Sequence, residues 1–105
     1  MAKSEIIADV LNRVAEETEI SKEQIFSHCR QQEIVDARHM AIMLMCEYGV
    51  YMSRIASVFG VSLRSVYSVR TDFDNRMSCN KPLKISHQRI LQKLRTNFEQ
   101  TLKQV

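Results

Sequence analysis

The sequence predicts an all-α fold, a helical bundle that contains a helix-turn-helix and an additional C-terminal helix. Three observations support this prediction. The chain has only two glycines and one proline in 105 residues. Its apolar residues recur at the three- and four-residue spacing of helices, and no segment shows the alternation of a strand. Residues 51–71 carry a helix-turn-helix pattern.

Three helices are expected before that motif. Ser4 is expected to cap a helix that ends near Thr18, with an apolar stripe made of Ile6, Ile7, Val10, Leu11 and Val14. Residues Ser21–Gln24 resemble a capping box and predict a short helix ending near Cys29. Residues 30–35 would then form a connection. Asp36 would cap a third helix, which Gly49 ends just after Tyr48. The methionines of this helix are expected to fill a core.

The helix-turn-helix is predicted from residues 52–59 and 62–75. Ala56 is small enough for two helix backbones to approach closely, and Gly60 can make the turn because glycine adopts positive φ at little cost. Apolar residues would hold the second helix on the first; these are Ile55, Phe59, Val61, Val66 and Val69. The second helix has the form of a recognition helix for the DNA major groove.

The predicted organisation is a helix-turn-helix domain over residues 1–77, a linker over 78–85 and an amphipathic helix over 86–105. The linker is inferred from Pro82, and Ser86 is the expected cap of the last helix. The apolar face of that helix consists of Ile90, Leu91, Leu94, Phe98 and Leu102. It would pack on the domain or on a partner, which could be a second copy or a replication or transcription protein.

Charge is distributed unevenly along the chain. Residues 1–61 carry six basic and nine acidic side chains, whereas residues 62–95 carry eight basic and two acidic ones. A positive excess that begins at the proposed recognition helix favours binding of a polyanion. A basic surface that is merely solvated is the alternative.

Other classes of function find little support in the sequence. Cys29, Cys46 and Cys79 lie far apart without a CxxC pair, so free thiols are expected rather than a metal site. No nucleophile setting or cofactor motif is recognisable, so we expect no enzyme, no metal and no cofactor. No apolar run is long enough to span a membrane, and no signal peptide is evident, so a cytoplasmic protein is expected.

Specific residues are predicted to contact double-stranded DNA. The expected base contacts on the second helix are Ser62, Leu63, Arg64, Ser65, Tyr67 and Ser68. Arg64 is the strongest candidate, because an arginine can bond bidentately to O6 and N7 of guanine. The expected phosphate contacts that follow are Arg70, Arg76, Lys81 and Lys84. Arg38 is expected to have a structural role instead, in an ion pair with Glu33 or Asp36.

The run from Phe26 to Ala41 resembles the entry to the C-terminal DNA-binding domain of the bacterial replication initiator DnaA. The order Glu33-Ile34-Val35, then Arg38 and Ala41, carries the similarity, which extends over roughly residues 5–77. The resemblance implies a Trp-repressor-like helical bundle that binds DNA. It also implies that Arg30 approaches the minor groove and that Ser53 and Arg54 touch phosphates.

The recognition helix departs from the pattern of that family. The family's signature is Gly-Gly followed by Arg-Asp-His-Thr-Thr, and this chain has Gly60-Val61-Ser62-Leu63-Arg64-Ser65 in its place. The family's ATPase domain is not expected either, since these 105 residues hold no Gly-Lys-Ser/Thr phosphate loop. The prediction is therefore sequence-specific binding of duplex DNA at a site other than a DnaA box, in replication initiation or transcription regulation. A protein-interaction module on the same scaffold is the alternative.

Overall fold

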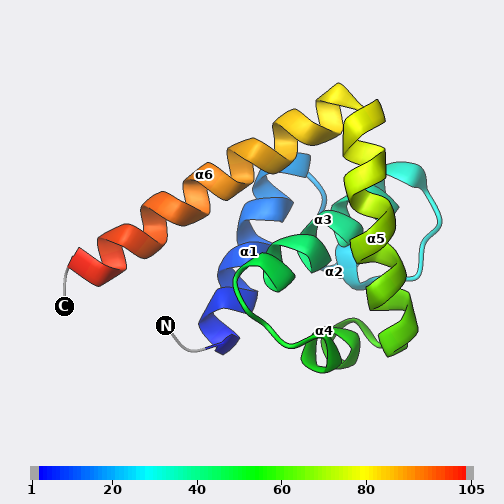
Figure 1. Ribbon diagram of the computed structural model, residues 1–105, viewed down its shortest axis with the longest axis horizontal. Helices are drawn as coiled ribbons and strands as arrows, with labels where there is room; N and C mark the ends of the chain where they lie inside the picture. Colours follow the sequence, from blue (N-terminus) through cyan, green and yellow to red (C-terminus); the bar gives the residue numbers. More distant parts are fainter. Residues whose placement is uncertain (1–2, 104–105) are drawn as a thin grey trace.

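The computed structural model describes the backbone of residues 3–103 and the side chains of residues 4–96. Within this part of the chain there are six helices and no strand, which confirms the all-α prediction (Figure 1). The helices are α1 (Lys3–Thr18), α2 (Lys22–Phe26), α3 (Gln32–Glu47), α4 (Met52–Phe59), α5 (Leu63–Cys79) and α6 (Lys81–Lys103). None of the helices described is long and apolar enough to cross a membrane.

The core is organised around α3. This helix is buried at eight positions, which are Ile34, Ala37, Met40, Ala41, Ile42, Met43, Leu44 and Met45. Helices α1, α5 and α6 pack around it, and Val10, Phe73 and Leu94 from these helices are fully buried beside it. The α3 methionines therefore fill the core. Because its neighbours all pack against one helix, α3 determines how they are placed relative to one another.

Two helices end at a glycine in the left-handed region. Gly49 has φ 82° after α3, and Gly60 has φ 64° after α4. In both cases the following residue donates back across the end of the helix, Val50 to the carbonyl of Met45 and Val61 to that of Ala56, each at 3.0 Å. These are the bonds of the Schellman motif. The second of them makes the sharp turn between α4 and α5.

The start of α3 was predicted wrongly. The helix begins at Gln32, four residues before Asp36, so most of the expected connection at 30–35 is helical. The carbonyl of Gln31 accepts from the amides of Ile34 and Val35, both at 3.0 Å, without any side-chain cap. Ile34 is buried, and its burial anchors the first turn in place of a polar cap.

The expected linker at 78–85 is also helical, apart from Asn80. The Oδ1 atom of Asn80 accepts from the amide of Leu83 at 3.2 Å, and so caps the start of α6. Pro82 lies in the first turn of α6, where a helix does not need its missing N–H. Proline here marks the start of a helix. Ser86 consequently lies inside α6 and does not cap it.

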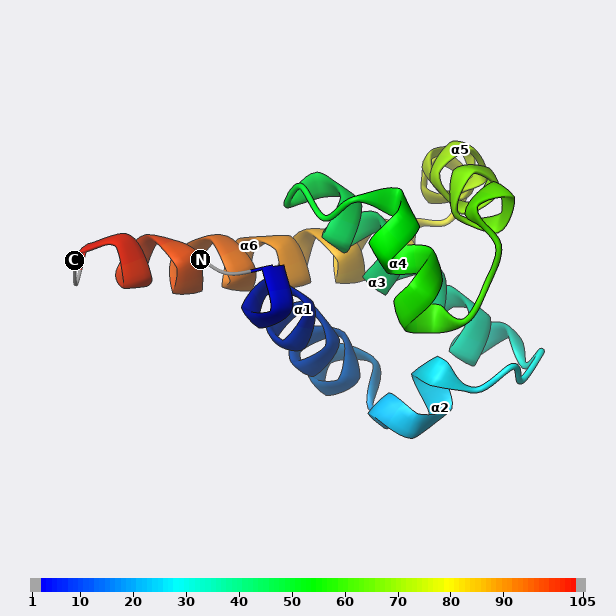
Figure 2. The same cartoon turned by 90° about the horizontal axis from the view of Figure 1, so that it is seen from below.

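Helix α6 crosses α1, α3 and α5 and then extends away from them (Figures 1 and 2). Leu83, Ile90 and Leu94 belong to the same buried cluster as the other helices. Next to this contact, the carboxylate of Glu17 on α1 lies 3.5 Å from Arg89 and 3.6 Å from Lys93. The side chains of Phe98 and Leu102 lie outside the described residues.

The turn at Gly60 gives a direct test of the fold. A Cβ atom at this position would meet no atom within 4 Å, so only the positive φ opposes substitution. We expect Gly60→Ala to lower the free energy of unfolding by about 1–2 kcal/mol, the cost of the left-handed conformation. Gly60→Asn should cost less, because asparagine tolerates that conformation better. Urea denaturation of the three proteins measures the order, and an alanine variant as stable as the parent would contradict it.

A second prediction concerns the buried His87. The residue is 5% exposed, and its ring centroid lies 5.8 Å from that of Phe73. Burial lowers the pKa of His87, and the carboxylate of Glu47, 3.5 Å from Nε2, offsets this in part. Because the unfolded chain then binds the proton more readily, stability should fall as the pH falls through the ordinary histidine pKa of about 6.5.

The measurement is the free energy of unfolding at several pH values between 8 and 5 for the parent and for His87→Met. The variant should show a shallower decline, since it lacks the titrating ring. His39 titrates in both proteins, so the difference between the two curves isolates His87. Parallel curves would show that protonation of His87 does not oppose folding.

Candidate nucleic-acid interface

Helix α5 begins at a serine cap. Ser62 has extended backbone angles, φ −75° and ψ 156°, and its Oγ accepts from the amide of Ser65 at 3.1 Å. The hydroxyls of the two serines are also 3.0 Å apart. Both residues were predicted to contact bases. In the structure, these hydrogen bonds cap the N-terminus of α5 directly after the turn at Gly60.

One side of α5 packs on the core and the opposite side faces solvent. Val66, Val69 and Phe73 form the buried stripe. With 3.6 residues per turn, Arg64 lies opposite this stripe. All six predicted base-contacting residues are exposed; they are Ser62, Leu63, Arg64, Ser65, Tyr67 and Ser68. The first two turns of α5 therefore present Arg64 at the centre of an exposed arc.

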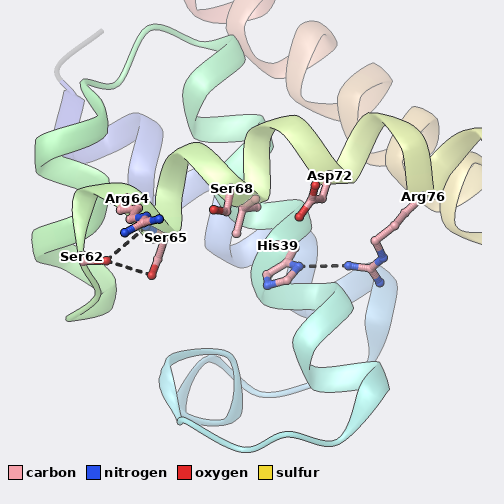
Figure 3. Close-up of a pocket in the computed structure, with 8 residues that line it drawn as sticks. His39, Ser62, Arg64, Ser65, Ser68, Asp72 and Arg76 are labelled. Carbon is pink, nitrogen blue, oxygen red and sulfur yellow. Dashed lines mark hydrogen bonds between the residues drawn. The ribbon is translucent and has the colours of Figure 1, made fainter.

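An open groove of about 500 Å³ runs along one edge of this arc (Figure 3). It is lined by His39, Ser62, Arg64, Ser65, Ser68, Val69, Asp72 and Arg76. Four of the predicted base-contacting residues thus meet at the groove. Leu63 and Tyr67, which are 45% and 52% exposed, are not among the lining residues. These two residues lie on the other flank of the arc.

A polar cluster between α3 and α5 lies beside the groove, which His39 and Arg76 help to line. Arg76 pairs with the carboxylate of Asp36 and bonds to Nδ1 of His39 at 3.0 Å. A guanidinium can only donate, so Nδ1 accepts and the neutral ring carries its proton on Nε2. Burial lowers the pKa of His39 and Arg38 lowers it further, whereas Asp72 raises it. The neutral form is therefore the one that fits this cluster.

Arg76 was expected to contact a phosphate, but its guanidinium already has partners inside the protein. The side chain of Arg76 is half-buried and paired with Asp36, whereas Arg70 on the same helix is exposed. Within the described residues, Arg76 thus acts as a link from α5 to α3.

The loop between α2 and α3 carries Arg30, which is exposed. The loop lies on the same side of the molecule as α5, with the start of α3 between them (Figures 2 and 3). Arg38 holds it by donating to the carbonyls of Ile25 at 3.0 Å, of Cys29 at 3.1 Å, and of Ser27. The expected ion pair of Arg38 with Glu33 or Asp36 is therefore replaced by bonds to backbone carbonyls.

The remaining predicted phosphate-contacting residues occupy two places. Ser53 and Arg54 are exposed in the first turn of α4. Lys81 and Lys84 are exposed in the first turn of α6, which begins beyond the C-terminal end of α5; α5 itself is about 25 Å long at 1.5 Å per residue. The structure brings Arg54 and Arg64 to the helix-turn-helix, but it does not bring the two lysines there.

The partners of Asp36, Arg38 and His39 were not foreseen from the sequence. The available signal was three polar residues within one turn, directly before the apolar run Met40–Met45, since polar residues beside a buried run need partners inside the protein. Among the residues described, no group of three histidine, cysteine or acidic side chains could hold a metal ion. Cys29 and Cys79 are exposed free thiols, and Cys46 is half-buried.

In a comparison with known protein families, the family described as the helix-turn-helix of bacterial DnaA protein matches residues 7–68, which is more than half of the chain. The match extends from α1 into the second turn of α5, so it includes the Arg30 loop, α4 and the exposed arc. A search of curated proteins found no match.

The polar cluster leads to a prediction about stability. Arg76→Gln should lower the free energy of unfolding by about 1–3 kcal/mol, because it leaves the half-buried Asp36 without its charged partner. Arg70→Gln, six residues earlier on the same helix and exposed, is the matched control and should change stability by less than about 0.5 kcal/mol. Thermal or urea unfolding of both variants measures the difference, and equal losses would mean that the cluster contributes nothing.

Proposed function

The chain belongs to the bacterial DnaA helix-turn-helix family, and we propose that it binds duplex DNA sequence-specifically through α5. Membership of this family implies DNA binding, and a domain of this kind is not catalytic. The proposal goes further and assigns the reading of bases to the exposed arc of α5. Its biological setting would be replication initiation or transcription regulation.

One observation carries the proposal: the exposed arc of α5, which lines the groove, and the Arg30 loop lie on the same side of the molecule. A helix with one buried stripe and an exposed N-terminal half is the shape that enters the major groove. A phosphate backbone separates the major groove from the neighbouring minor groove. With α5 in the major groove, that backbone would follow the groove beside His39 and Arg30 would reach the minor groove.

The side chains on the arc suit the reading of base edges. Arg64 can donate two bonds to a guanine, and Ser68 can donate to or accept from a base. Tyr67 and Leu63, on the other flank, can contact the wall of the major groove or a thymine methyl group. Ser62 and Ser65 are engaged with each other and with the helix end, so their contribution would be to phosphates through the helix N-terminus.

The target should differ from the DNA box that DnaA recognises. Residues Gly60–Ser65 lack the Asp-His-Thr-Thr run of the family signature, although the scaffold beneath them is kept. Direct readout depends on the side chains that reach the bases. We therefore propose a member of the family whose scaffold positions a different set of reading residues.

The experiment is selection of bound sequences from a random duplex pool, followed by titration of the best sequence and of a scrambled duplex. Arg64→Ala should remove about 1–3 kcal/mol of discrimination between the two, because it deletes a base contact. Arg54→Gln, the matched control in α4, should weaken both duplexes alike and lower the slope of log K against log salt by about 0.9.

Two results would count against the proposal. Selection that yields no enriched sequence would remove sequence specificity and leave general duplex binding. No binding to any duplex at low salt would remove DNA binding by this chain, and would favour a scaffold that contacts proteins instead.

A further inference from the structure

Arg38 makes an unusual set of contacts for an arginine inside a helix. Its guanidinium, with Nε and Nη2 as donors, bonds to three carbonyls of one short segment, those of Ile25, Ser27 and Cys29. The carbonyl of Cys29 belongs to the peptide group that also contains the Arg30 nitrogen. Arg38 therefore holds the peptide unit from which the Arg30 side chain extends.

The loop has little else to fix it from outside. Residues 28–31 are all exposed, so no burial of side chains anchors them. Ser27 Oγ donates to the carbonyl of Gln24 at 2.6 Å and accepts weakly from the amide of Cys29 at 3.4 Å, but both bonds are local. Among the described residues, Arg38 is the side chain that hydrogen-bonds to the loop from another helix.

We propose that Arg38 is a positioning residue, which sets Arg30 at the height and angle needed to enter the DNA minor groove. This inference rests on the proposed function. An arginine suits the task because its planar guanidinium has donors fixed in several directions, whereas a lysine presents a single flexible ammonium. With its donors directed at the loop carbonyls, Arg38 acts on DNA through Arg30.

Arg38 would favour DNA binding by preorganising the loop that carries Arg30. A free five-residue loop samples many backbone conformations, and ordering it on binding costs free energy for each residue fixed. Arg38 orders the loop before DNA arrives, at the expense of its own side-chain freedom. Removing Arg38 should therefore weaken binding only in so far as Arg30 contributes to it.

A double-mutant cycle tests this dependence on the selected duplex. The proteins are the parent, Arg30→Ala, Arg38→Met and the double variant, with Arg38→Lys as the conservative change. Each single change should raise Kd several-fold, and the double variant should bind no more than twofold more weakly than Arg30→Ala. Arg54→Gln combined with Arg38→Met is the control, and their fold-changes should multiply because Arg54 lies in α4.

A second readout separates positioning from general loss of structure. Netropsin, which fills the minor groove of A·T-rich DNA, should weaken binding of the parent but have little effect on Arg30→Ala or Arg38→Met. Amide NMR shifts in the free proteins should change at residues 27–31 in Arg38→Met and stay unchanged along α5. Arg38→Lys should fall between the parent and the methionine variant in both measurements.

Several results would overturn the inference. Fold-changes of Arg30→Ala and Arg38→Met that multiply would make Arg38 an independent contact. A loop whose amide shifts are unchanged in Arg38→Met and Arg38→Lys would show that it is held by other means. If the parent binds no duplex, the proposed function fails, while the shifts at residues 27–31 still decide whether Arg38 orders the loop.

Discussion

The structure depends on the pairing of three polar residues that share one turn of α3. Half of the residues of this helix are buried, and Asp36, Arg38 and His39 lie beside two of them, Ala37 and Met40. Burying such groups is costly unless each finds a partner. Arg38 finds the carbonyls of the α2–α3 loop, while Asp36 and His39 find Arg76 on α5. The hydrogen bonds and ion pair that these three side chains need thus connect α3 both to the α2–α3 loop and to α5, the two parts of the proposed interface.

The loop and the recognition helix are consequently placed by a common support. Arg76 reaches α3 from α5, and Arg38 reaches the loop from α3, so α3 holds both elements in a fixed relation. A further contact joins α2 to the helix-turn-helix, where the rings of Phe26 and Phe59 lie 5.3 Å apart. A site that is fixed in this way loses less conformational freedom when a rigid duplex binds.

The features that the sequence predicted are those set by neighbours in the chain. The turn at Gly60, the helix end at Gly49 and the capping box at Ser21 need only residues within five positions, and all three are present. The start of α3 was missed because the burial of Ile34, a tertiary effect, replaces a polar cap. Arg76 and His39 are 37 positions apart, and no local pattern announces such a pair. The exposure of the arc around Arg64 could be predicted from helical periodicity. The groove, and the hydrogen bonds of Arg38 to the loop carbonyls, could not, because they depend on how the helices pack.

Ion pairs within the protein reduce the number of basic residues after position 61 that are free to contact DNA phosphates. Of the basic residues there, Arg76 is held by Asp36, and Arg89 and Lys93 face Glu17 on α1. Lys81 and Lys84 lie in the first turn of α6, so Arg64 and Arg70 are the exposed cations of this region on the recognition helix itself. The electrostatic part of binding depends on phosphates that are neutralised, and not on formal charge. With few such cations near the arc, affinity would have to come largely from shape and from the placement of individual side chains. Such an interface gains most from the rigid support that α3 provides.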